Sequence, residues 1–335
     1  MASMRDIKRR KSSISSTQQI TKAMKLVSTV KLQKARTRAE HTAPYSEYMY
    51  RTLCSILARS GMINHPYLRA GDSPRKAVIV ITSNRGLAGG YNSNVVKLVT
   101  GSGMNKDDLD IYSIGAKGTE LLTRRGYHIV LDSPEVIESP TYADASVLCE
   151  KLLNAYTNGE VGEIYLAYTY FKNTVSHEPR LVKLLPLGIE DETGDGLGSA
   201  TGTDSSSGIS GSSSAAVGSR MTSDAAAGND AEVSASNSAG SSSQTGSGAI
   251  AVMNYEPSEE EALDEIIPKY VTSLIHGALI EAVASENGAR MQAMDSATSN
   301  AEEMIDDLTL KYNRARQGAI TQELTEIIAG ANAIA

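Results

Sequence analysis

The sequence has no tryptophan and a single phenylalanine among its 335 residues. Without tryptophan and with one phenylalanine, it has few bulky anchors for a wide globular core and suits narrow contacts between helices. Its two cysteines, Cys54 and Cys149, are far apart, which favours reduced thiols in a cytosolic compartment over a disulfide scaffold or a zinc site. No apolar run approaches the ~18 residues that span a bilayer, and no signal peptide opens the chain. We therefore expect any role at a membrane to depend on partners.

The sequence also lacks a pattern typical of a catalytic or metal centre. His128 and His177 lie far apart, without the cysteine or carboxylate spacing of a metal site. No nucleophile stands beside a base and an orienting group. We expect no catalytic residue, no metal and no bound cofactor.

Negative charge is nearly missing from the first part of the chain. The formal net charge is −7, yet residues 1–38 hold eleven lysines and arginines against one acid, Asp6. Such a basic run is usually a solvent-exposed helix face. A more specific interpretation is that it contacts a ring of acidic side chains on another protein. Nucleic acid is disfavoured, because no aromatic side chain for stacking precedes Tyr45.

The dominant feature of the sequence is helix, and residues 255–335 have the pattern of one very long helix. Pro257 and the acids after it suit a first turn, where proline is tolerated and carboxylates meet the positive end of the dipole. Pro268 predicts a kink or a short separate helix before it. From Lys269 to Ala329 the helix would extend about 90 Å, so it must leave the body and needs a partner along its length. Apolar and small residues recur at steps of three and four, as in a coiled-coil seam, at Met294, Ala297, Ala301, Ile305, Leu308, Tyr312, Ala315 and Ala319.

Residues 3–59 form the second helical stretch, with a bend expected near Pro44. This stretch is basic, whereas the C-terminal helix carries acidic residues at 302, 303, 306 and 307. An antiparallel pair would therefore attract as well as bury its seam.

Between these helices the pattern changes to short strands alternating with helices. Strands are predicted at 76–82, 109–114, 128–131 and 163–170, and helices from Asn92, at 116–125 and at 142–156. Residues 175–185 predict an antiparallel edge strand. This alternation predicts a small, mostly parallel sheet covered by helices. The fold class is α/β with long helices: an antiparallel coiled coil of the N- and C-terminal helices plus a small Rossmann-like α/β domain.

Residues 191–248 differ again, because 17 of these 58 positions are serine and 11 are glycine. They cannot bury enough apolar surface to offset the entropy of ordering, so we predict a disordered insertion. The predicted domains are 1–60 (N-terminal coiled-coil helix), 75–188 (α/β domain), 191–248 (insertion) and 255–335 (C-terminal coiled-coil helix).

Two glycine turns follow strands and suggest nucleotide binding. The first, with Gly86, Gly89 and Gly90, has the spacing G-x-x-G-G rather than G-x-G-x-x-G. The second, residues 115–119, lacks the full phosphate-binding loop. We favour tight turns that let helices pack on the sheet. Near the C-terminus, residues 312–326 are dense in side chains that form directional hydrogen bonds; most such runs are solvated faces, but this one suits a surface that grips a partner.

Three blocks of sequence carry a family resemblance. They are residues 4–10 with 17–27 and 43–45, residues 82–90, and residues 285–294 with 308–317 and 320–323. The chain resembles the gamma subunit, or central stalk, of bacterial F-type ATP synthases over nearly everything except residues 191–248. That family is a rotor whose paired helices turn inside a ring of alpha and beta subunits, coupling rotation of the c ring to conformational cycling of the catalytic beta subunits.

The resemblance implies partners and contact residues. The partners are the alpha and beta subunits, the epsilon subunit and the c ring, with no nucleic acid, and the location is the cytoplasmic face of the bacterial cell membrane, peripherally. The residues expected to contact the alpha/beta ring are Met24, Lys25, Arg290, Arg316, Gln317, Thr321, Glu323 and Glu326. Those expected at the c ring or epsilon are Met253, Tyr255 and Glu256.

Two departures from the family pattern are visible. Asn84 and Ala88 stand where the family usually has an acid and a cysteine, a change that is compatible with a packing turn but argues against a charge role there. Typical bacterial members lack the insertion, and because it contains no cysteine we predict no redox switching. From the residues alone, two other functions remain open: a coiled-coil scaffold protein with an α/β head, and a Rossmann-like nucleotide enzyme.

Overall fold

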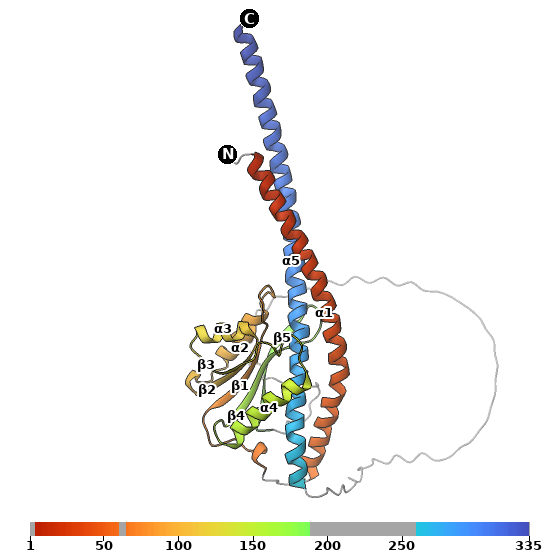
Figure 1. Ribbon diagram of the computed structural model, residues 1–335, viewed down its shortest axis with the longest axis vertical. Helices are drawn as coiled ribbons and strands as arrows, with labels where there is room; N and C mark the ends of the chain where they lie inside the picture. Colours follow the sequence, from red (N-terminus) through yellow and green to blue (C-terminus); the bar gives the residue numbers. More distant parts are fainter. Residues whose placement is uncertain (1–3, 60–64, 188–258, 335) are drawn as a thin grey trace, which may run out of the picture. The chain divides into compact units, whose positions relative to one another are not determined.

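Two long helices, α1 (Met4–Arg59) and α5 (Glu259–Ile334), form the long part of the fold (Figure 1). The computed structural model describes residues 4–59, 65–187 and 259–334, all within one unit of the chain. The segment 191–248, expected to be a disordered insertion, lies outside the described residues.

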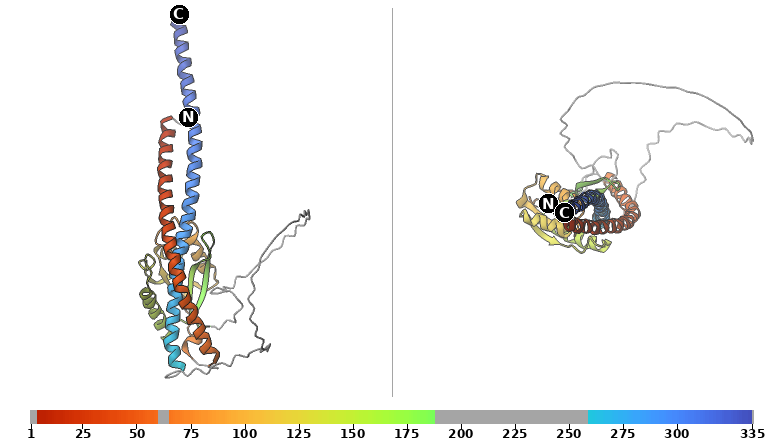
Figure 2. Two further views of the ribbon diagram at one scale, coloured as in Figure 1. Left: turned by 90° about the vertical axis from the view of Figure 1, so that its right-hand side faces the viewer. Right: turned by 90° about the horizontal axis from the view of Figure 1, so that it is seen from above.

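The two helices pair in antiparallel fashion, and the views in Figures 1 and 2 agree that they lie side by side. Contacts run from Thr21 with Thr298 to Tyr50 with Tyr270, so the numbering rises along one helix as it falls along the other. Between these points Leu32, Ala35 and Ala284 form a buried cluster. The predicted antiparallel coiled coil is confirmed.

Both prolines lie within continuous helix. α1 runs through Pro44 and α5 through Pro268. We expected a kink or a short separate helix before Pro268, and of these two alternatives the separate helix is wrong. Proline in a helix interior costs about 3 kcal/mol because it removes a hydrogen bond and crowds the preceding turn. At this point α5 is buried through Ile267, Tyr270 and Val271, and this packing holds the helix together across the proline.

The α/β domain contains a five-stranded sheet in the order β3-β2-β1-β4-β5. Its strands are β1 (Lys76–Ile81), β2 (Leu109–Ile114), β3 (His128–Asp132), β4 (Glu163–Phe171) and β5 (His177–Leu185). All neighbours are parallel except β4 and β5, as predicted. The connecting α-helices are α2 (Tyr91–Gly101), α3 (Ala116–Arg124) and α4 (Tyr142–Thr157), and short 3₁₀ helices span Pro66–Leu68 and Lys106–Asp108.

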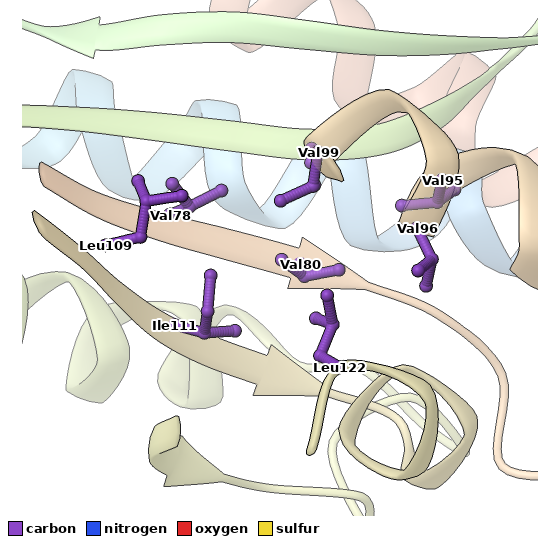
Figure 3. Close-up of a cluster of buried hydrophobic side chains, with 9 residues drawn as sticks. Val78, Val80, Val95, Val96, Val99, Leu109, Ile111 and Leu122 are labelled. Atoms are coloured by element: carbon purple, nitrogen blue, oxygen red, sulfur yellow. The ribbon is translucent and has the colours of Figure 1, made fainter. Parts of the chain in front are cut away.

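The main buried cluster of this domain is aliphatic. Val78 and Val80 of β1 lie with Ile111 of β2 against helix side chains such as Val96 of α2 and Leu122 of α3 (Figure 3). All five are fully buried. The domain joins the helix pair through β4, where the Ser285 hydroxyl of α5 donates to the Thr169 carbonyl. The predicted fold class is confirmed.

Candidate functional site

The glycine loop, residues 82–90, links β1 to α2 and is held by side-chain hydrogen bonds. The Ser83 amide donates to Asn92 Oδ1 at 2.9 Å, and Asn84 Nδ2 donates to the Pro134 carbonyl at 2.6 Å. Asn84 Oδ1 accepts from the Ala116 amide at 3.1 Å. An amide can donate and accept in this way, whereas a carboxylate could only accept. Asn84, one of the two departures from the family pattern, therefore serves as a bridge between loops.

Arg290 joins the glycine loop to α5. Its guanidinium lies 2.6 Å from Glu286 and 3.4 Å from the Gly86 carbonyl, and only 13% of each charged side chain is exposed. Nearby, the Tyr91 hydroxyl donates to the Ala282 carbonyl at 3.2 Å. Burial, with the Glu286 charge, raises the pKa of Tyr91 well above its ordinary value, while Arg290 acts the other way. Arg290 already has a carboxylate partner in its own chain, so its expected pairing with a partner's acids stays a prediction.

The second glycine turn is a packing feature. Gly115 has φ +107°, and a Cβ there would lie 2.1 Å from the Thr82 carbonyl oxygen. At Gly118 a Cβ would lie 2.6 Å from Thr82 Oγ1. Any side chain would collide with the end of β1, so both glycines are needed for α3 to approach the sheet.

The seam of the helix pair contains polar contacts that set its register. The hydroxyls of Thr21 and Thr298 lie 2.8 Å apart, and Lys25 Nζ lies 2.5 Å from Asp295 Oδ1. Met24 and Lys25, expected to face a partner, are both half-buried. The Lys25 ammonium therefore forms an ion pair within its own chain while its side chain remains partly exposed to solvent.

The C-terminal part of α5 has the opposite character. Residues 320–332 are exposed at every position, and four large apolar side chains there are 49–67% exposed: Ile320, Leu324, Ile327 and Ile328. The polar residues predicted to grip a partner, Arg316, Gln317, Thr321, Glu323 and Glu326, lie on this same exposed helix. In Figure 1 this segment continues beyond the start of α1. Apolar groups at this density on one helix indicate a protein-binding surface.

The other predicted contact residues, Met253, Tyr255 and Glu256, lie outside the described residues. Met24 and Lys25 on α1 and Arg290 on α5 are in the region where the helices pair, whereas Arg316 to Glu326 lie toward the free end of α5. The structure therefore places the expected ring contacts in two groups along the helix pair.

One polar group that we did not predict is Glu281, on the buried side of α5. Its pKa is raised to about 7 by burial, against the opposing effects of the Arg180 charge and a hydrogen bond with Tyr168. Its Oε2 atom has no hydrogen-bond partner among the described residues. The sequence could have indicated this group, because Glu281 is the one acidic residue in the otherwise apolar run 278–284.

The described residues contain no group of three or more side chains suited to a metal ion. His128 lies 2.9 Å from Asp110, which also pairs with Arg75, and His177 stacks on Phe171. Among the described helices, α5 is long and apolar enough, by length and composition alone, to cross a membrane. Charged and polar residues nevertheless interrupt its apolar stretches. Over its most apolar window α5 is 56% buried in the protein, and core helices of soluble proteins pass the same test.

A helix pair that carries an α/β domain at one end and a bare helix at the other is the architecture of a rotary-motor central stalk. Residues 3–334 match the family described as ATP synthase. A relative named ATP synthase gamma chain, from Lachnoclostridium phytofermentans, is 57% identical over 334 residues, covering 100% of both chains. The chain belongs to the ATP synthase gamma chain family, and it is a non-catalytic rotor subunit, peripheral to the membrane.

Other relatives agree. An ATP synthase gamma chain from Alkaliphilus metalliredigens is 40% identical, and a sodium ion specific one from Acetobacterium woodii is 37% identical; each match covers 99% of this chain and 98% of the relative. The L. phytofermentans relative matches from end to end, so its length leaves room for residues 191–248, unlike the typical members we expected.

Solved structures share the fold at low identity. A chain from the Euglena gracilis mitochondrial ATP synthase OSCP/F1/c-ring structure has a TM-score of 0.62 at 16% identity, covering 99% of this chain and 94% of that one. A chain from the Tetrahymena thermophila central stalk/c-ring structure has a TM-score of 0.51 at 18% identity, covering 83% and 99%.

Proposed function

We propose that this rotor couples turning of the c ring to conformational cycling of the catalytic beta subunits, with the free end of α5 inside the alpha/beta ring. The observation that carries the proposal is the bare segment 320–332, which exposes large apolar side chains and against which no other described helix packs. Burying these apolar side chains inside a ring of partner subunits would be favourable, because it removes apolar surface from water.

Coupling of this kind needs asymmetry rather than a reactive group. Around the free end of α5, charged and amide side chains such as Arg316 and Gln317 alternate with apolar ones such as Leu324. Three identical subunits around one such helix would each meet a different face. Each catalytic site would then favour a different conformation, and rotation would shift these populations in turn.

The remaining contacts in the proposal follow the family resemblance. Arg316, Gln317, Thr321, Glu323 and Glu326 bind loops of the ring, and Met24, Lys25 and Arg290 lie where a lever of beta would meet the helix pair. The c ring and the epsilon subunit bind at the other end, near Met253, Tyr255 and Glu256. The assembly stands on the cytoplasmic face of the cell membrane.

We propose protons as the translocated ion. The relative named sodium ion specific is 37% identical to this chain and the A. metalliredigens relative is 40% identical, so likeness of the gamma chain does not select the ion. Membrane vesicles that contain the whole complex supply the test: ATP should drive proton uptake in sodium-free buffer. Uptake that requires sodium and moves sodium would overturn this part of the proposal.

The coupling role is tested with Arg316→Ala combined with Gln317→Ala in the same vesicles. At equal complex abundance we expect ATP-driven ion uptake to fall severalfold. Lys311→Ala is the matched control, because Lys311 is exposed on the same helix and pairs with Asp307 of its own chain. Unchanged uptake in the double variant would remove these two residues from the mechanism. Recovery of the chain from membranes without any ATPase subunit would instead favour the scaffold function.

A further inference from the structure

A cleft of about 320 Å³ lies where the glycine loop, the β4–β5 hairpin and α5 meet. In the sheet order, β2 and β3 lie on one side of β1 and β4 lies on the other, so the order in which successive strands are added reverses between the parallel strands β1 and β4. The cleft opens beside the carboxyl ends of these two strands. In open α/β sheets this switch point is where ligands bind.

The walls of the cleft are rich in hydrogen-bond donors and contain no carboxylate. One stripe of α5 contributes Gln292 and Ser296, together with Ala289 and Ala293. Asn94 lines the cleft from α2, and Thr169 and His177 line it from the hairpin. A donor-rich wall without acidic side chains favours a ligand that carries negative charge.

Helix α2 begins at this cleft. Its N-cap residue is Gly90, which has no side chain to cap the first turn, and Gly89, Gly90 and Tyr91 all line the cleft. The positive end of the 11-residue helix is therefore directed to this region. Free amides at a helix N-terminus bind phosphate and similar anions.

An independent observation indicates that this cleft binds a ligand. Thr169 is 3% exposed, and its Oγ1 has no hydrogen-bond partner among the described residues. Both ring nitrogens of His177 are likewise buried, with no side-chain partner among the described residues, and burial lowers the pKa of this ring against the opposing effect of the Thr174 backbone. Buried polar atoms in proteins are almost always satisfied, so unpaired ones beside a cleft indicate a partner that binds there.

We propose that this cleft binds a small molecule through a phosphate group, held by the N-terminus of α2, Thr169 and His177. The group accepts hydrogen bonds from the Thr169 hydroxyl and from a His177 N–H, and Gln292 and Asn94 close the rim. The inference does not depend on the coupling role proposed above.

The test uses the purified full-length chain, whose folding is checked by circular dichroism. Equilibrium dialysis measures binding of inorganic phosphate and of ribose 5-phosphate, each up to about 10 mM, the weak end of the affinity scale. Tighter binding of the ester would show that the rest of the cleft is used, and equal binding would identify free phosphate as the ligand. Absence of binding by both probes to the folded chain would overturn the proposal.

Variants assign the binding to the cleft. Thr169→Val removes the hydroxyl at nearly constant volume and should weaken binding about tenfold, the effect of one hydrogen bond to a charged group. Thr157→Val, on α4 away from the cleft, is the matched control. Because Gln292 is exposed, its variants should fold: Gln292→Lys should tighten binding severalfold and Gln292→Glu should weaken it. Binding that is indifferent to all three cleft variants would place the anion elsewhere and sink the proposal.

Discussion

The ammonium of Lys25 on α1 lies 2.5 Å from the carboxylate of Asp295 on α5, one turn from the hydroxyl pair of Thr21 and Thr298. These contacts join residues that are about 270 positions apart in the chain. A slip of either helix by one turn would break both, so together they specify one register of the antiparallel pair.

The Lys25–Asp295 pair should contribute little to stability in spite of its short distance. Its side chains are 38% and 57% exposed, and exposed pairs are worth about 0.2–1 kcal/mol. We expect Lys25→Glu to destabilise the chain by about that amount and Lys25→Glu with Asp295→Lys to restore it. Urea unfolding of the four chains in a double-mutant cycle measures this coupling. It should vanish at about 1 M salt, and a coupling that survives such screening would contradict a solvated pair.

The fold was largely predictable because its signals are local. The β-branched run at 76–82 and the seam from Met294 onward each encode one element and its buried face. The continuous helix through Pro268 was not predictable, because packing from elsewhere in the chain overrides the local cost of proline. The same limit applies to the site. Residues of the bare helix could be identified from their types, whereas the partners of Arg290 and Lys25 depend on which loop and which turn of the other helix lie opposite.

Gly115 should tolerate no side chain. Gly115→Ala combines a left-handed φ of +107° with a Cβ 2.1 Å from a backbone oxygen that cannot move without disturbing β1. We expect a loss of at least about 3 kcal/mol in the free energy of unfolding. Gly101→Ala is the control, because no atom lies within 4 Å of its Cβ position, and it should be neutral or slightly stabilising. Similar melting temperatures for the two variants would contradict the packing role of the second glycine turn.

Gly288 and His177 should be energetically coupled. A Cβ on Gly288 would lie 2.6 Å from His177 Cε1, and the ring also stacks on Phe171 with centroids 5.8 Å apart. Gly288→Ala should therefore destabilise the chain by about 1–3 kcal/mol through overpacking, although alanine is the better helix former. In a His177→Ala background the same change should stabilise by up to about 1 kcal/mol. Thermal unfolding of the four chains measures this reversal of sign, and a Gly288→Ala effect of one sign in both backgrounds would refute the coupling.

Glu281 should make the stability of the chain depend on pH. In the folded chain burial raises the pKa of this carboxyl to about 7, whereas a glutamate in the unfolded chain titrates near 4.5. The folded state therefore holds the proton more tightly. The stability from this group is fully present below about pH 4.5 and is lost as the pH rises through about 7, a decrease of roughly 3 kcal/mol. The Arg180 charge and the hydrogen bond with Tyr168 both act on the same carboxyl, and they keep its pKa from rising further.

Glu281→Gln removes this titration while keeping the shape of the neutral acid. We expect the variant to be more stable than the natural chain at pH 8 and close to it at pH 5, as measured by urea unfolding at both values. The exposed Glu303→Gln is the matched control and should leave the difference between the two pH values unchanged. Since Glu281 lies where α5 packs on β4, loss of its proton should loosen the contact between the helix pair and the α/β domain before either part unfolds. Hydrogen exchange of β4 amides at pH 8 should therefore slow in Glu281→Gln, and equal exchange in both chains would show that this carboxyl does not govern the contact.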